Sequence, residues 1–374
     1  MPGKATSRKP GRYADAVRSI WRHSDGVESR ESVQRNDTVP LDEAARQNGA
    51  ISQNEDAIRR DIVRYATLAP SGHNAQCWRF QIEDHCISIL PDLSRRTPVV
   101  DPDDHHLYVS LGCAAENLVL AAQVYGFDGA LRFSSASDGV VSVSLIRSSA
   151  IRPASPLFQA IPYRQCTRAE YDGRPLGSEE LRLLQAAGTG SGVAPILLTG
   201  HESIEKVLES AVQGNTMQIS NPAFVDELEH WIRFSDAEAV RTGDGLPSRA
   251  TGNPPVPRWL GRRLFRMLFR PQPENDRLAR HIRSSAGIAL FVSNVDDRAH
   301  QVEAGRCYQR FALQATALGI RNAFINQPVE EPALRREFAR AFAPADGRPN
   351  LVVRFGRGQK MPRSLRRPLE AVLL

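Results

Sequence analysis

The chain has 374 residues, 41% of them hydrophobic and 24% charged, which is typical of a soluble globular protein with room for two moderate domains. No apolar run approaches the ~20 residues of a membrane-spanning helix, and no apolar segment follows the charged N-terminus as in a secretory signal. The formal charge of +6 permits nucleic-acid binding. Zinc-finger spacing and aromatic-basic sheet motifs are missing, so nucleic acid is not an expected partner, although a helix-turn-helix stays open.

Five cysteines are scattered along the chain without C-x-x-C spacing. An odd number of isolated thiols is typical of a reducing compartment and argues against a structural metal site. We therefore expect a cytoplasmic protein without a bound metal. The five residues are Cys77, Cys86, Cys113, Cys166 and Cys307.

Residues 1–54 are polar and rich in Arg, Ser, Asp and Gln, with only short apolar pieces. Such a composition favours a disordered arm, because little apolar surface is available to offset the entropy of ordering. We expect one helix in this arm, around Tyr13–Arg22. Binding of a partner by the Arg-rich arm is a further hypothesis.

The first long periodic segment is an amphipathic helix, Ala57–Leu68. A Pro-Ser-Gly turn ends the helix, and the loop Ala69–Gln76 leads to a stretch of alternating apolar residues that predicts strands. The loop offers backbone N–H groups, a hydroxyl and two carboxamides, which suit the polar edge of a planar heterocycle. Simple capping of the helix is the competing interpretation.

Two distant segments predict an internal repeat. Gly112–Phe127 and Gly305–Ile320 each begin with a glycine, reach a second glycine 14 positions later and carry a matching apolar stripe between them. The two segments are 193 positions apart and predict two similar halves that pack together. Strands are expected after the first copy, at Gly129–Phe133 and Val140–Ile146.

The second half begins near Pro156 and contains an expected insertion, Met217 to about Arg283. Within it, a basic helix at Trp259–Phe269 carries apolar residues that favour packing against the body. An ordinary surface excursion and a membrane-surface helix are the alternatives. The expected elements that follow are a buried strand at Ile288–Val292, a helix at Glu331–Phe342, a strand at Leu351–Phe355 and a basic tail.

The stretch APSGHNAQCW, starting at Ala69, resembles the APSGxNxQPW signature of the FMN-dependent nitroreductase superfamily, with Cys77 in place of the proline. RQCTR at residues 164–168 resembles the RRSxRxF segment of that superfamily, and RFGRG…PRSLRRP resembles its C-terminal end. The resemblance covers residues 56–374 and is closest to the two-halved Acg-type branch. It implies an α+β nitroreductase-like fold with tandem half-domains, 55–155 and 156–374, which form an intrachain pseudo-dimer with a lid at about 217–283.

The two halves keep different parts of the motif set, so the resemblance implies one chain with one complete FMN site. It places the phosphate near the 164–168 window and the tail, the ring against the loop after Ala69, and the reactive edge near residues 326 and 327. The implied cofactor-binding residues are Pro70, Ser71, Gly72, Asn74, Gln76, Arg164, Cys166, Thr167, Arg168, Asn326, Gln327, Arg363, Ser364, Arg366 and Arg367.

The implied activity is an NAD(P)H-dependent two-electron reduction of a small organic acceptor, a nitro compound or a quinone. The alternative is an FMN-sequestering protein whose lid closes the site and allows little turnover. No Ser-His-Asp set, paired carboxylates or HExxH supports hydrolysis, and no catalytic residue is assigned, although His73 is either a proton donor or a hydrogen-bonded loop residue. The fused halves fit a monomer, and a homodimer stays open.

Overall fold

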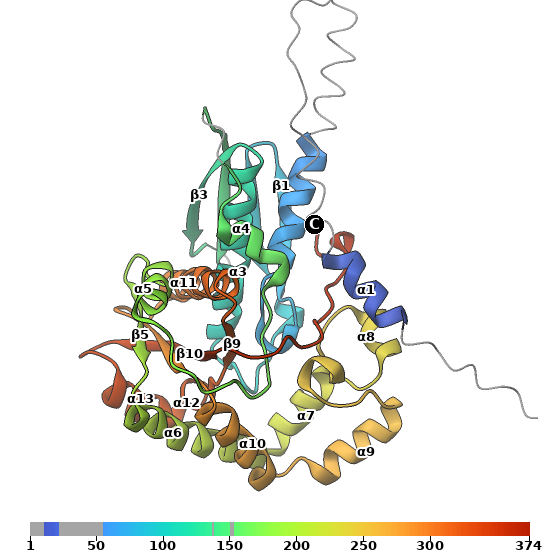
Figure 1. Ribbon diagram of the computed structural model, residues 1–374. Coiled ribbons are helices and arrows are strands. Elements are labelled where there is room, and N and C mark those ends of the chain that lie inside the picture. The colour runs from blue at the N-terminus through green and yellow to red at the C-terminus, as the bar shows by residue number, and fades with distance from the viewer. Residues whose placement is uncertain (1–10, 22–54, 137, 150–152) are drawn as a thin grey trace, which may run out of the picture.

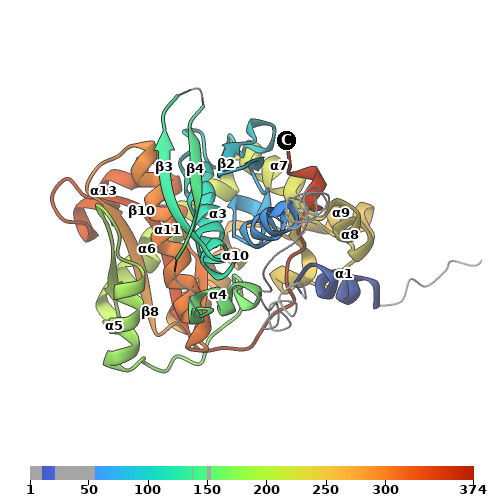
Figure 2. The ribbon, with the colours of Figure 1, turned by 90° about the horizontal axis from the view of Figure 1, so that it is seen from above.

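The computed structural model describes residues 11–21, 55–136, 138–149 and 153–374. Two four-stranded sheets lie on either side of a central pair of long helices, and further helices form an arc around one end of the molecule (Figures 1 and 2). The predicted α+β class is confirmed.

The first sheet is antiparallel throughout, in the order β1-β2-β4-β3. Apolar side chains alternate toward the core along β2 and β4, which is the period-two pattern that the sequence predicted. In chain order, the central helix α3 comes between the second and third strands of this sheet. The elements are β1 (Trp78–Glu83), β2 (Cys86–Pro91), α3 (His105–Val124), β3 (Phe127–Ser134) and β4 (Val140–Arg147).

The second sheet has the order β5-β8-β10-β9, and its strands are also all antiparallel. Counted along the chain, this is the same first-second-fourth-third order, again with a long helix, α11, between the second and third strands. Every residue of β8 is buried, because helices cover both of its faces. The elements are β5 (Val193–Leu198), β8 (Gly287–Ser293), α11 (Arg298–Ala317), β9 (Arg321–Phe324) and β10 (Arg348–Gly356).

The two copies of the predicted repeat lie in α3 and α11, and these helices contact each other where they cross. A Cβ on Gly112 would lie 1.9 Å from the carbonyl oxygen of Val302, and a Cβ on Gly305 would lie 2.0 Å from that of Val109. Both contacts join residues related by the same 193-position offset, so the crossing is nearly two-fold symmetric. Only glycine allows the two backbones to approach so closely.

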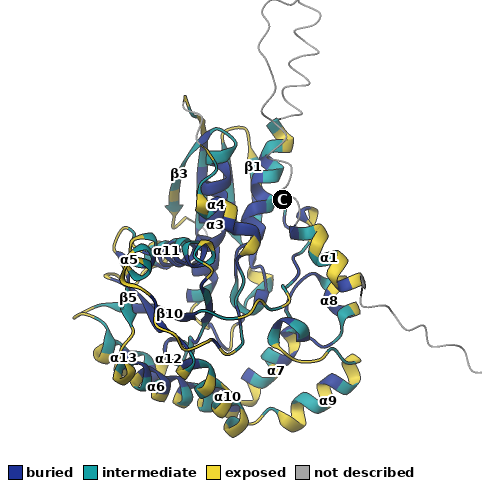
Figure 3. Ribbon diagram, in the orientation of Figure 1, coloured by how far each residue is buried: buried dark blue, intermediate teal, exposed yellow. Residues whose placement is uncertain are grey.

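Helix α3 is, within the described residues, the one helix long and apolar enough to cross a membrane. Within the protein, 89% of its apolar window is buried, because the first sheet and α11 cover it (Figure 3). Its composition is therefore that of a core helix.

The chain leaves the second sheet after Leu198 and returns at Gly287. The expected start of the insertion, Met217, falls inside α6, so the helical excursion begins earlier than the sequence predicted. It comprises α6 (His201–Ser220), α7 (Pro222–Trp231), β6 (Ile232–Arg233), α8 (Asp236–Thr242), β7 (Leu246–Pro247), a 3-10 turn (Ser248–Thr251), α9 (Arg258–Leu268) and α10 (Pro271–Arg283).

Helix α9 packs against neighbouring parts of the excursion through both apolar and charged contacts, and the ring of Phe265 meets that of Phe234. Gly261 lies against Phe234, and Arg262 and Arg266 both pair with the buried carboxylate of Glu229. The expectation that its apolar residues pack against the body is wrong for Met267 and Leu268, which are exposed.

The helix expected in the N-terminal arm is confirmed as α1 (Gly11–Trp21). Tyr13 and Trp21 are buried, and α1 packs beside α8, so this part of the arm is an ordered part of the body (Figure 1). The predicted disorder of the rest of the arm falls on residues 1–10 and 22–54, which lie outside the described residues.

The C-terminal tail runs from the second sheet across to the first. The N–H of Phe80 donates to the carbonyl of Val372, and the N–H of Leu374 donates to the carbonyl of Phe80, so the tail adds to the edge of β1. Other short elements are 3-10 turns at Gly72–Asn74, Leu93–Arg95, Ile161–Tyr163 and Leu369–Ala371, and helices α4 (Pro156–Ala160), α5 (Ser178–Ala187), α12 (Gln327–Glu330) and α13 (Pro332–Phe342). A helix over residues 55–67 precedes the loop at Ala69.

Candidate functional site

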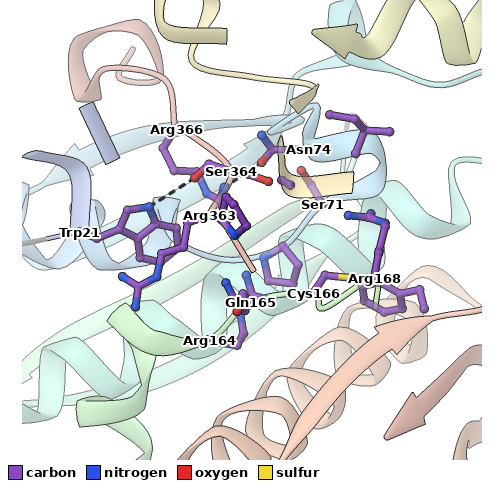
Figure 4. Close-up of a pocket in the computed structure, with 15 residues that line it drawn as sticks. Trp21, Ser71, Asn74, Arg164, Gln165, Cys166, Arg168, Arg363, Ser364 and Arg366 are labelled. Atoms are coloured by element: carbon purple, nitrogen blue, oxygen red, sulfur yellow. Dashed lines mark hydrogen bonds between the residues drawn. The ribbon is translucent and has the colours of Figure 1, made fainter. Parts of the chain in front are cut away.

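A pocket lies where the loop after Ala69, the 164–168 segment, the helical excursion and the C-terminal tail meet (Figure 4). The space that it encloses, counted together with its open mouth, is about 550 Å³. Four arginines and no carboxylate line it. The lining residues are Trp21, Pro70, Ser71, Asn74, Arg164, Gln165, Cys166, Arg168, Leu246, Ala250, Phe324, Pro362, Arg363, Ser364 and Arg366.

Arg164 lines the pocket with buried hydrogen-bond donors that have no partner in the protein. Its side chain is buried, with 3% of the residue exposed, and its Nε and Nη1 atoms have no hydrogen-bond partner. Its Nη2 atom makes a long contact, 3.5 Å, with the carbonyl of Leu68, and the Tyr308 hydroxyl lies near the same guanidinium. A buried guanidinium with free donors costs free energy until an anion accepts from it. The position is therefore ready for an anionic group.

Arg168 and Arg363 extend this positive surface. Neither forms an ion pair with another described residue. The guanidinium of Arg363 lies 5.1 Å from the ring centre of Trp21 and 5.6 Å from that of Tyr163, a cation–π arrangement on two sides. Burial lowers the pKa of Arg363 below its usual range, and the nearby Arg164 charge adds to the effect.

Arg366 lines the same pocket but has no donor left for a ligand. Its Nε atom donates to Thr67, its Nη2 atom to Leu68 and Ala69, and its Nη1 atom to Asn74 and Leu365, which accounts for all five N–H groups. The sequence prediction that it hydrogen-bonds a phosphate is therefore wrong in this structure. Burial lowers its pKa to about 9, with repulsion by Arg164 as the second cause.

The two carboxamides of the loop are also committed to the protein. The Asn74 side chain donates to Gly245 and Leu365 and accepts from Arg366, while that of Gln76 donates to Gly243 and accepts from the backbone of Arg367. The expectation that these groups face a heterocycle edge is thus corrected, because they join the loop to the excursion and the tail. Asn74 still borders the pocket, whereas Gln76 is fully buried behind it.

Gly72, Thr167 and Arg367 lie outside the pocket lining. Gly72 borders a smaller neighbouring hollow that contains Asp101 and His106. Arg367 turns toward Ala371 and Asp92 instead. Thr167 is fully buried with a hydroxyl that has no partner, one residue from the lining positions 166 and 168.

Asn326 and Gln327 are likewise not brought to the pocket. The side chain of Asn326 accepts from the backbone N–H of Val352, and Gln327 packs against Gly214 of α6. Both therefore serve the junction between the second sheet and the excursion. Phe324, two residues earlier on β9, lines the pocket and was not predicted.

Other lining residues were also missed by the sequence analysis. Trp21 comes from α1, and Leu246 and Ala250 come from the excursion. The signals available were an aromatic at the end of a predicted helix and a Gly-rich turn inside the insertion, and neither carries a motif. Gln165 and Pro362 stand beside predicted residues, so proximity alone would have found them.

His73 lies in the loop with a positive φ of 50°. Burial lowers its pKa to about 4, and the charge of Arg168 is the second cause. The imidazole is thus neutral near pH 7 and unsuited to acting as a charged acid there.

No family model matches the chain. Two curated proteins from Mycobacterium tuberculosis, strains CDC 1551 and H37Rv, are each 25% identical over 328 residues, which covers 84% of this chain and 90% of theirs; both are named "putative NAD(P)H nitroreductase". These nearly full-length matches confirm the resemblance to the nitroreductase superfamily.

Solved structures with weaker likeness include a nitroreductase with bound FMN from Bacteroides fragilis, at 14% identity and a TM-score of 0.33, covering 55% of this chain and 89% of that one. Another is an NADPH:FMN oxidoreductase from Vibrio harveyi complexed with NAD+, at 12% identity and a TM-score of 0.35, covering 59% and 76%. These TM-scores are too low for the superpositions to locate a site.

Proposed function

We propose that the protein is an FMN-dependent oxidoreductase that uses NAD(P)H to reduce a small organic acceptor, a nitro compound or a quinone, by two electrons. The observation that carries the proposal is the acid-free pocket with four arginines, one of which is buried with unpartnered donors. The names of the two M. tuberculosis relatives supply the reaction class.

The residues present fit an FMN phosphate. Arg164, Arg168 and Arg363 would hold it, since a guanidinium donates in pairs and stays charged, and Cys166 and Ser364 lie between them in the lining. Pro70 and Ser71 would border the ring. FMN, when bound, supplies the hydride chemistry. The arginines favour whichever ligand form carries more negative charge, because few opposing charges offset them in a low-dielectric site.

We further propose that residues 55–155 and 156–374 are tandem half-domains forming an intrachain pseudo-dimer with one flavin site. The shared strand order, the near-symmetric crossing of Gly112 and Gly305, and the tail that joins both sheets support this division. Such a chain needs no second copy to complete the site, so a monomer is expected. The five free cysteines favour the cytoplasm.

The test is an absorption spectrum of the purified protein, followed without oxygen after addition of NADPH and then NADH. The proposal expects a yellow protein that bleaches with at least one donor and recovers its colour with a nitro compound or a quinone. A colourless protein that also takes up no added FMN would refute the cofactor assignment.

A sequestering role is the second candidate, and the attachment of the excursion favours it. Leu246 and Ala250 border the pocket, and the neighbouring Gly243 and Gly245 accept hydrogen bonds from Gln76 and Asn74. A cover fixed in this way would limit access of a donor. Bound FMN that resists both nicotinamides would support sequestration, whereas rapid turnover of a small nitroaromatic would exclude it.

A further inference from the structure

Helix α1 lies directly on the part of the tail that lines the pocket. The Tyr13 hydroxyl donates to the carbonyl of Arg363 at 2.6 Å, and the Trp21 indole N–H donates to the carbonyl of Ser364 at 3.3 Å (Figure 4). Tyr13 also packs with Ala239 of α8 and Leu365 in a small apolar cluster of their own. Residues near the two ends of α1 thus donate hydrogen bonds to the carbonyls of consecutive tail residues.

The Trp21 ring also lies between two of the pocket arginines. The guanidinium carbons of Arg363 and Arg366 lie 5.1 Å and 5.2 Å from its centre. The two cations have no carboxylate partner among the described residues, and the negative face of an indole is well suited to stand near them.

The consequences differ for the two arginines. Arg366 is fixed by its five hydrogen bonds, so it does not depend on the indole. Arg363 donates no hydrogen bond to any described residue, and the rings of Trp21 and Tyr163 are what orient it. Without Trp21 its long side chain would regain rotamer freedom, and that freedom would be lost again on binding an anion.

We infer that α1 is a component of the anion site, and that Trp21 is a positioning residue that holds Arg363 toward the phosphate of the ligand. The inference rests on the proposed function for the identity of that ligand, FMN. Trp21 carries no charge and acts through Arg363 and the tail, so its contribution is specific for a ligand with a phosphate. Helix α1, which lies in an arm whose composition favours disorder, completes the site.

The experiment compares FMN with riboflavin, which has the same ring but no phosphate. Equilibrium binding of both is measured on the full-length wild type and on Trp21→Ala, Trp21→Phe and Arg18→Ala. Arg18 is the matched control, because it lies on α1, is exposed and pairs only with Asp15. Far-UV circular dichroism and the thermal midpoint of each apo variant report folding.

Trp21→Ala is expected to weaken FMN binding by about tenfold, the size of one desolvated cation–π contact, and to change riboflavin binding less than about twofold. Trp21→Phe keeps a ring under Arg363 and should recover most of the FMN affinity. Inorganic phosphate is the second probe: it should raise the thermal midpoint of wild type and Arg18→Ala more than that of Trp21→Ala.

Equal losses for FMN and riboflavin in Trp21→Ala, or no loss for either, would overturn the inference while leaving the proposed function intact. A wild-type protein that binds no FMN would overturn the proposed function and this inference together. If Trp21→Ala fails to fold, Trp21→Phe against Arg18→Ala decides, since a loss of FMN affinity of about tenfold in Trp21→Phe, the size expected for removal of the ring, would contradict the role of the ring.

Discussion

Two walls of the pocket use the same residue type in opposite ways. Arg164, on the 164–168 wall, and Arg366, on the tail wall, are both more than nine-tenths buried. Arg366 gives all five of its N–H groups to the protein, whereas two nitrogens of Arg164 have no partner. Burial of a charge therefore does not reveal its role; the count of free donors does. One wall holds the loop and tail together, and the other awaits a ligand.

The largest expected effect comes from Arg366→Ala. The change removes the donors that Arg366 provides to the carbonyls of residues 67–69, and it removes the cation at the C-terminal end of the preceding helix. The free energy of unfolding should fall by about 3–5 kcal/mol, as when a buried charge network is broken. Urea unfolding measures it, with the exposed Arg336→Ala as the control. A loss below that of the control would show that the tail wall is not held by Arg366.

Arg164→Ala is expected to weaken ligand binding without destabilising the protein. FMN affinity is expected to fall by about a hundredfold, because a charge-assisted pair of hydrogen bonds is lost. The free energy of unfolding of the apo protein should stay level or rise, since a buried charge without partners is removed. Fluorescence titration and urea unfolding on the same sample test both halves of the prediction. Destabilisation without loss of FMN affinity would show that Arg164, like Arg366, stabilises the protein and does not bind the ligand.

The neutral His73 predicts a pH dependence. Its pKa of about 4 in the folded protein lies below the ordinary 6.5, so the unfolded chain takes up a proton first as the pH falls. The stabilisation is complete above pH 6.5 and is lost as the pH falls toward 4, by at most about 2 kcal/mol between pH 6.5 and 5. His73→Asn, which tolerates the positive φ, should flatten this slope in urea unfolding. An unchanged slope would assign the effect to other groups, such as His281, whose pKa is also about 4.

The smallest expected effect is that of Tyr13→Phe, which removes only the hydrogen bond from α1 to the Arg363 carbonyl. A single such bond contributes about 1 kcal/mol. The thermal midpoint should fall by about 1–2 °C, and FMN affinity should fall less than in Trp21→Ala. A larger loss of affinity than for Trp21→Ala would mean that α1 acts through the tail backbone rather than through the indole.

The sequence predicted those parts of the molecule that repeat or that carry local patterns. The Gly112 and Gly305 stripes predicted both central helices, and the loop after Ala69, the RQCTR window and the tail together supplied nine of the fifteen lining residues. It could not predict how the donors are used. Asn74, Gln76 and Arg366 find their partners at residues 67–69, 243–245 and 365–367, and only the folded chain shows which carbonyls lie within reach. Trp21 was missed because it lies far along the chain from the loop after Ala69 and no motif marks it.

The packing of α11 against α3 has a consequence during synthesis of the chain. Its apolar flank is closed by α11, whose matching residues follow 193 positions later. At ordinary rates of translation that interval is roughly 10–40 s. Throughout that interval the nascent chain contains a helix long and apolar enough to cross a membrane, while its packing partner has not yet been synthesised. A chain that stalls before Arg298 would therefore leave this apolar flank exposed, and the 193-position offset between the two helices sets how long that exposure lasts.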